Sequence, residues 1–177
     1  MKIHPWCIAT VTTAKAIQAL TEAQTEQSGS ATRGGTSRGG TYRTDHPWYV
    51  AHDLWLEAQR QEAQVPILFA VQNGNTIGFT HYALITGIDV LSKQLGGYET
   101  ACRFTTLAEM HVIWRDLDSV ALKPAAEQLE REAREGLHVH RFHLTSQLIR
   151  PYALCETPPF LLNPPPVKKI ESVHYTE

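Results

Sequence analysis

The residues best suited to chemistry are arginines set in a glycine-rich stretch. Arg33, Arg38 and Arg43 recur every five residues within ATRGGTSRGGTYRT (31–44), and no acidic residue lies between Glu26 and Asp45. A guanidinium group can bind phosphate through two hydrogen bonds and can stack on a base, while glycine lets the backbone approach closely. The spacing is therefore compatible with an arm that binds nucleic acid.

The same stretch is open to three other interpretations. A P-loop requires a lysine and a preceding strand, whereas here the lysine is missing and the stretch follows an expected helix, so that interpretation fails. The stretch can also be a solvated, mobile loop, because its backbone entropy is costly to lose and Tyr42 is its one large apolar residue. A site for a small phosphate compound is the third interpretation, and the last two stay open.

Histidines are the next residues with possible chemistry. His138 and His140 fall on one face of an expected strand, LHVHRFHL (137–144), and could bind zinc if Glu109 or Asp116 joined them. Adjacent imidazoles on a surface strand are common without any metal. We therefore assign no metal, no cofactor and no catalytic residue.

Composition limits the class of protein. The chain has 177 residues, a formal net charge of −2 and 42% hydrophobic residues, which suits one domain with a real core and argues against a surface that is basic all over. No apolar run approaches the ~18 residues that span a bilayer, so no membrane partner is expected. The three cysteines lack CxxC spacing and favour a reducing, cytoplasmic location, with Cys7 and Cys102 inert inside apolar strands.

Hydrophobic periodicity predicts the elements that position these residues. We expect one domain over 1–160, interrupted by a flexible Gly/Arg loop at 28–46, and a proline-rich tail at 161–177. The expected helices cover 13–27, 47–64 and 124–136, and the expected strands cover 6–12, 65–72, 76–91, 102–107, 110–117, 137–144 and 148–156.

The strongest local signal is a hairpin. Asn73-Gly74-Asn75 separates two apolar runs, and both residue types accept the positive φ of a tight turn. The returning run is long and is expected to bend at Gly78 or Gly87. Because no crossover helix separates the central strands, the pattern indicates an α+β fold with a small mixed β-barrel and two or three flanking helices.

The order of elements resembles the PUA-like superfamily, and within it the EVE and ASCH type domains. The likeness covers roughly half the chain and is carried by PWCIATVT, VPILFAVQNGNTIGFTHYALITGIDV and LHVHRFHLTSQLIRPYAL. The chain departs from the pattern in lacking a Gly-Asp dipeptide before Val65. The lysine, threonine and glutamate set of ASCH amidohydrolases is not identified in it either.

The resemblance implies recognition of RNA, DNA or a flipped or modified base in an aromatic pocket, because every base has a face on which an indole can stack. The expected ligand-binding residues are Trp6 and Trp48, each preceded by His-Pro, together with Tyr82 and the arginines Arg33, Arg38 and Arg43. The expected function is non-catalytic binding of nucleic acid or a nucleotide.

Three alternatives stay open. Tryptophans are also common core residues, which is the simpler interpretation of each indole. The chain can instead be an amidohydrolase or phosphoesterase for a nucleoside-like substrate, using His138, His140 or Lys15, or it can be a protein–protein interaction module.

Overall fold

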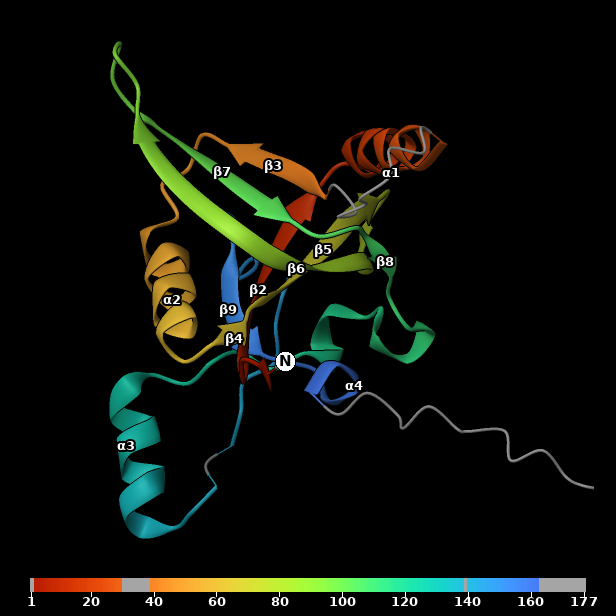
Figure 1. Ribbon diagram of the computed structural model, residues 1–177. Coiled ribbons are helices and arrows are strands. Elements are labelled where there is room, and N and C mark those ends of the chain that lie inside the picture. The colour runs from red at the N-terminus through yellow and green to blue at the C-terminus, as the bar shows by residue number, and fades with distance from the viewer. Residues whose placement is uncertain (1, 30–38, 139, 163–177) are drawn as a thin grey trace, which may run out of the picture.

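The chain forms an α+β fold built on one curled sheet (Figure 1). Its structure, a computed structural model, describes residues 2–29, 39–138 and 140–162, with the backbone alone for 25–29. None of the helices in these residues is long and apolar enough to cross a membrane.

The main sheet has the strand order β3-β7-β6-β5-β2-β9, with short β8 paired to β6. The β2–β5 pair is parallel and the other pairs are antiparallel, so the sheet is mixed as expected. Its strands are β2 (Trp6–Thr12), β3 (Gly40–Thr44), β5 (Pro66–Asn73), β6 (Thr76–Ser92), β7 (Tyr98–Phe104), β8 (Ala108–Glu109) and β9 (Ala153–Glu156). A separate parallel pair joins β1 (Lys2–Ile3) to β4 (Ala63–Gln64).

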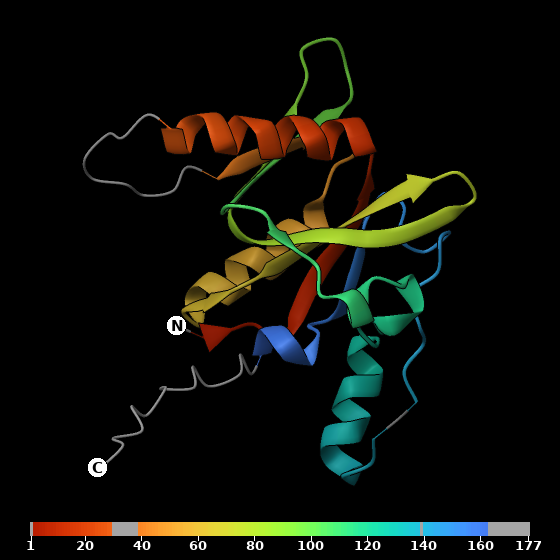
Figure 2. The same cartoon turned by 90° about the vertical axis from the view of Figure 1, so that its right-hand side faces the viewer.

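The expected barrel is found only in part. The sheet curls into a half-barrel whose edges are β3 and β9, and these two strands do not pair within the described residues (Figures 1 and 2). Strand β6 is irregular on both sides, because its pairing with β7 shifts register between Ile85 and Gly87 and its pairing with β5 shifts between Phe69 and Ala70. A Cβ at Gly87 would lie 2.2 Å from Nη2 of Arg103, so the absence of a side chain at Gly87 leaves room for the Arg103 guanidinium.

The predicted β5–β6 hairpin is confirmed. Gly74 turns the chain with φ +63°, and Asn73 pairs with Thr76 across the turn. Most residues of β5 are buried, because both faces of this central strand are covered.

The three predicted helices are also confirmed, as α1 (Ala14–Gly29), α2 (Tyr49–Arg60) and α3 (Ala126–Glu135). The hydroxyl of Thr13 accepts a hydrogen bond from the Ala16 amide at 3.0 Å and so caps α1. Gly136 ends α3 in the left-handed conformation that its position predicted. Short helices follow elsewhere: η1 (Val112–Trp114), η2 (Leu117–Ser119) and α4 (Pro159–Leu162).

Successive residues of the central strands point to opposite faces of the sheet and belong to two separate hydrophobic cores. Ile8 and Phe69 belong to the core under α1 and α2, while Cys7 and Leu68 belong to the core on the opposite face. The second core is closed by irregular segments that contribute Met110, Leu117, Val120, Leu144 and Ile149. Those segments therefore replace a second layer of helices.

Two predicted strands are wrong for this reason. Residues 110–117 form 3₁₀ turns, with Val112 and Ile113 70% and 69% exposed, and the described residues of 137–144 contribute one bridge, His143 to Ala121. Both segments have strand-like composition, but they pair only through isolated bridges, Asp116 with Gly78 of β6 and His143 with Ala121, and not as continuous ladders. The expected loop over 28–46 is also corrected, because Gly40–Thr44 forms edge strand β3 against β7.

Candidate functional site

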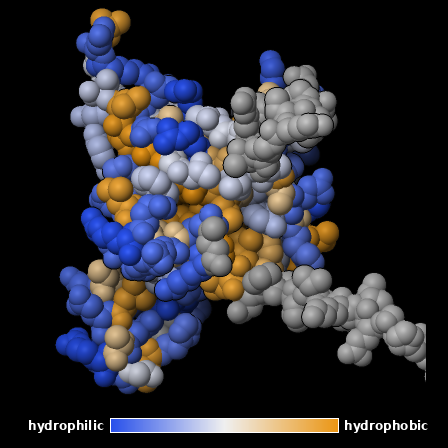
Figure 3. All heavy atoms as spheres, in the orientation of Figure 1, coloured by the Kyte–Doolittle hydropathy of each residue, from blue (hydrophilic) through white to orange (hydrophobic). Residues whose placement is uncertain are grey.

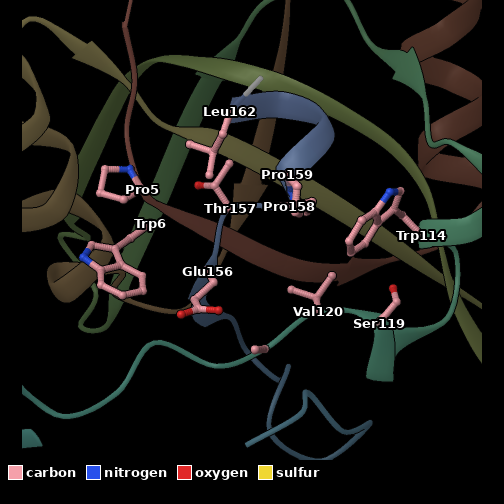
Figure 4. Close-up of a pocket in the computed structure, with 11 residues that line it drawn as sticks. Pro5, Trp6, Trp114, Ser119, Val120, Glu156, Thr157, Pro158, Pro159 and Leu162 are labelled. Carbon is pink, nitrogen blue, oxygen red and sulfur yellow. The ribbon is translucent and has the colours of Figure 1, made fainter. Parts of the chain in front are cut away.

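The candidate site is a hollow of about 430 Å³ that we call the indole pocket. It is built by three distant parts of the chain: the start of β2, the η1–η2 region, and the segment from β9 to α4. Figure 4 shows the indoles of Trp6 and Trp114 on opposite sides of it, with the carboxylate of Glu156 between them. The remaining lining residues are Pro5, Ser119, Val120, Ala121, Thr157, Pro158, Pro159 and Leu162.

Trp6 is held by backbone pairing and by its neighbours. It pairs with Glu156 across the β2–β9 ladder, so both side chains leave the same face of the sheet. The Trp6 amide donates a hydrogen bond to Nδ1 of His4 at 3.1 Å, and Nζ of Lys123 lies 5.5 Å from the indole centroid. The indole is half-buried, so one part of its surface contacts the protein and Lys123 forms a cation–π contact with the ring.

Trp114 is held from behind by an aromatic contact. Its ring lies 6.0 Å from that of Phe160 in α4, and Phe160 in turn meets Tyr82 edge-on at 5.5 Å. Tyr82, a predicted ligand-binding residue, therefore supports the pocket wall and does not line the hollow itself. Figure 3 shows an apolar area beside α4 in the middle of this face.

The charge in the pocket comes from one carboxylate. Glu156 is the ionisable residue among the lining residues, and its Oε1 accepts a hydrogen bond from Nε of Arg141 at 2.7 Å. Arg141 also binds Glu132 of α3 through both of its terminal nitrogens, and both side chains of that second pair are almost buried. The two carboxylates raise the pKa of Arg141. This network fixes the orientation of Glu156 beside the hollow.

Trp48, a predicted ligand-binding residue, lies inside a core and not beside the indole pocket. Its side chain is 0% exposed, in contact with Tyr152 at 4.9 Å and Tyr42 at 5.7 Å between ring centroids. The Trp48 amide donates a hydrogen bond to Oγ1 of Thr100 at 3.0 Å, which fixes the backbone at this position. The His-Pro-Trp repeat thus marks two different environments, one lining a pocket and one inside a core.

Of the three predicted arginines, only Arg43 lies in the described residues, and it does not line the indole pocket. Arg43 lies on β3 and forms an ion pair with Glu99 at 3.5 Å. Three strands separate β3 from β2, the strand of Trp6, in the order of the sheet (Figure 1). Arg33 and Arg38 lie outside the described residues, so their role stays a prediction.

The histidines do not form the expected pair on a strand. His138 and His140 are exposed on an irregular segment, and the ring of His140 contacts that of Phe142 at 6.2 Å. Within the part of the chain that the structure describes, no group of three His, Cys, Asp or Glu side chains is placed to hold a metal ion.

Neither Trp114 nor Glu156 is among the ligand-binding residues expected from the sequence. Trp114 was placed on a strand that does not exist, and Glu156 reaches the pocket only because the β9 strand pairs with β2. A partial signal was available, since Glu156 follows an apolar strand and precedes a Thr-Pro-Pro turn. Comparisons of the chain with protein-family models, with curated proteins and with solved structures found no match.

Proposed function

We propose that this protein binds a nucleobase, in a free nucleotide or in a single strand of RNA or DNA, without chemical turnover. The observation that supports the proposal is the indole pocket, where half-buried Trp6 and Trp114 face one hollow from opposite sides. Stacking of a base on an aromatic side chain contributes ~1–3 kcal/mol. The volume of about 430 Å³ lies within the range typical of small-ligand sites.

The polar groups of the pocket suit the edge of a base better than a phosphate. Glu156 accepts hydrogen bonds, and a base offers it ring N–H and exocyclic amino donors. The lining residues include no cation that could bind phosphate, so the phosphates of a ligand are proposed to lie outside the hollow. Arg43 is given no part in binding here, because it pairs with Glu99 far from the pocket.

The hydrolase alternative receives less support from this site. Its lining residues include no histidine, lysine or cysteine, and the hydroxyl of Ser119 donates to the Asp116 carbonyl at 2.5 Å. A serine nucleophile needs an adjacent general base to accept its proton. The lining therefore favours binding over covalent chemistry.

Titration of the four ribonucleoside monophosphates and of short single-stranded oligomers, followed by calorimetry and indole fluorescence, tests the proposal. Trp6→Leu and Trp114→Ala are each expected to weaken binding roughly 5- to 150-fold, the equivalent of ~1–3 kcal/mol. Trp55→Leu is the matched control, because Trp55 is half-buried on α2 and outside the pocket lining.

Salt separates pocket binding from binding by the glycine-rich arm. A base held by indoles and Glu156 should bind a monophosphate with nearly constant affinity between about 50 and about 300 mM salt, whereas each phosphate contact on an oligomer adds roughly one unit of log–log slope. Absence of any binding at millimolar nucleotide, or equal losses for the Trp6, Trp114 and Trp55 variants, would overturn the proposal.

A further inference from the structure

Two of the cysteines face each other across a strand pair. Cys7 on β2 and Cys155 on β9 are direct partners in the antiparallel register, and both carry free thiols with 0% exposure. Directly opposite residues of antiparallel strands have Cα atoms ~4.5–5.5 Å apart and side chains on the same face. A disulfide requires a Cα separation of ~4.4–6.8 Å, so the strand geometry suits one without movement of the backbone.

We propose that Cys7 and Cys155 form a reversible disulfide site that covalently joins β2 to β9. The two-electron oxidant is a small disulfide of the glutathione type. One protein thiolate attacks it, forming a mixed disulfide and releasing one glutathione thiolate. The second protein thiolate then displaces the other glutathione. Both cysteine protons are released, and the oxidant leaves as two thiols.

The surroundings of the pair favour slow oxidation that depends on local opening. Burial raises the pKa of Cys155 to about 12, and it raises the pKa of Cys7 well above its usual value, with the neighbouring Cys155 acting in the same direction. Thiols held in this way react slowly with a soluble oxidant. Strand β9 is short and is the last strand of the sheet, and its outer side is covered by Leu122, which bridges to Cys155. Access to both sulfur atoms therefore requires local opening of β9 from β2 and from this segment, which keeps oxidation slow.

The disulfide would form one residue away from the indole pocket. Trp6 and Glu156 are the chain neighbours of Cys7 and Cys155 and pair with each other in the same ladder. The thiol of Cys7 also contacts the Glu156 carbonyl at 3.6 Å. The covalent bond would therefore hold together the strand pair that carries one wall of the pocket.

Cys102 supplies the internal control. It is equally buried, burial raises the pKa of its thiol to about 12 as well, and its register partners on β3 and β6 are Tyr42 and Ile88. It matches Cys155 in chemistry but has no cysteine opposite.

The experiment is incubation of the full chain with oxidised and reduced glutathione in varied ratio, followed by acid quenching, alkylation and peptide mass spectrometry. We expect one dominant linkage, Cys7 to Cys155, which forms in the wild type and in Cys102→Ser. It should be reversed by excess reduced glutathione. Cys155→Ala should instead give at most mixed disulfides.

Two results would overturn the proposal. One is that the folded chain forms no Cys7–Cys155 linkage after prolonged oxidation, while the chain in denaturant does. The other is that linkages to Cys102 are as abundant as the Cys7–Cys155 linkage. Because the decisive map is made on the wild type, neither result depends on the folding of a variant, and neither depends on nucleotide binding.

Discussion

Replacement of Arg141 by methionine should release α3 from the body of the protein. No residue of α3 is buried, and α3 with the chain that follows it projects from the sheet (Figures 1 and 2). Arg141 forms ion pairs with Glu132 of α3 and with Glu156 of β9, and so links α3 to the main sheet. Methionine preserves much of the aliphatic length but leaves both carboxylates without this guanidinium.

The magnitude follows from the exposure of the three side chains. Breaking a fully buried ion pair by removing one partner costs ~3–5 kcal/mol. Glu132 and Arg141 are 12% and 13% exposed, but Glu156 is 34% exposed and is better screened. We therefore expect the free energy of opening of α3 to fall by about 2–3 kcal/mol, which is roughly 30- to 150-fold faster amide exchange.

Hydrogen–deuterium exchange measured by mass spectrometry reports this change directly. Peptides from 126–135 should exchange faster in Arg141→Met, while peptides from β5 should be unchanged. Arg131→Met is the matched control, because the Arg131–Glu135 pair lies on the same helix with side chains 67% and 45% exposed and should contribute less than ~1 kcal/mol. Equal acceleration of α3 exchange in the two variants would refute the assigned role of Arg141.

Three further predictions concern the rest of the fold. Trp48→Ala should cost ~3–5 kcal/mol of unfolding free energy by chemical denaturation, because it empties a fully buried core site; a loss below ~1 kcal/mol would contradict that burial. Gly39→Ala should destabilise by ~1–3 kcal/mol in the same assay, because its Cβ would lie 1.4 Å from the Phe104 carbonyl oxygen, and an unchanged midpoint would argue against this approach. Burial lowers the pKa of His4 below 6.5, so the unfolded state binds the proton more tightly. Stability should therefore be full above pH 6.5 and fall as the pH drops through the lower folded pKa. His4→Gln should flatten the unfolding free energy measured between about pH 7.5 and about pH 5.5, and an unaltered pH profile would reject this assignment.

The elements that sequence predicted well are those determined by nearby residues. The hairpin at Asn73-Gly74 and the end of α3 at Gly136 depend on backbone conformations that few residue types adopt, so local chemistry is sufficient. Strand β2 was likewise predicted over its observed length, because its apolar and β-branched residues are buried on both faces.

The elements that failed depend on distant partners. The apolar residues Val112 and Ile113 have strand-like composition, but a strand requires a neighbouring edge, and the segment instead covers the second core. Strand β3 shows the reverse case: Gly40–Thr44 was expected to be a loop, and it forms a strand because it pairs with β7. The local sequence of a segment does not show whether a partner strand will be available to it.

The surroundings of the predicted site residues also depend on distant parts of the chain. The burial of Trp48 is decided by α2 and the rings around it, while the placement of Trp6 in a pocket is decided by β9. Both tryptophans have the same two residues before them, and the difference between them arises only on folding. Arg33 and Arg38 lie outside the described residues and stay predictions.

The pairing of β2 with β9 also sets an order of events during synthesis. A ribosome adds residues one after another from the N-terminus, so Trp6 is made long before Glu156, its partner. Until β9 emerges, the outer edge of β2 has no strand to receive its hydrogen bonds. Contacts this distant along the chain also slow folding. A nascent chain that stops short of residue 153 can therefore complete the β5–β6 hairpin, but it has no means of assembling a ligand site.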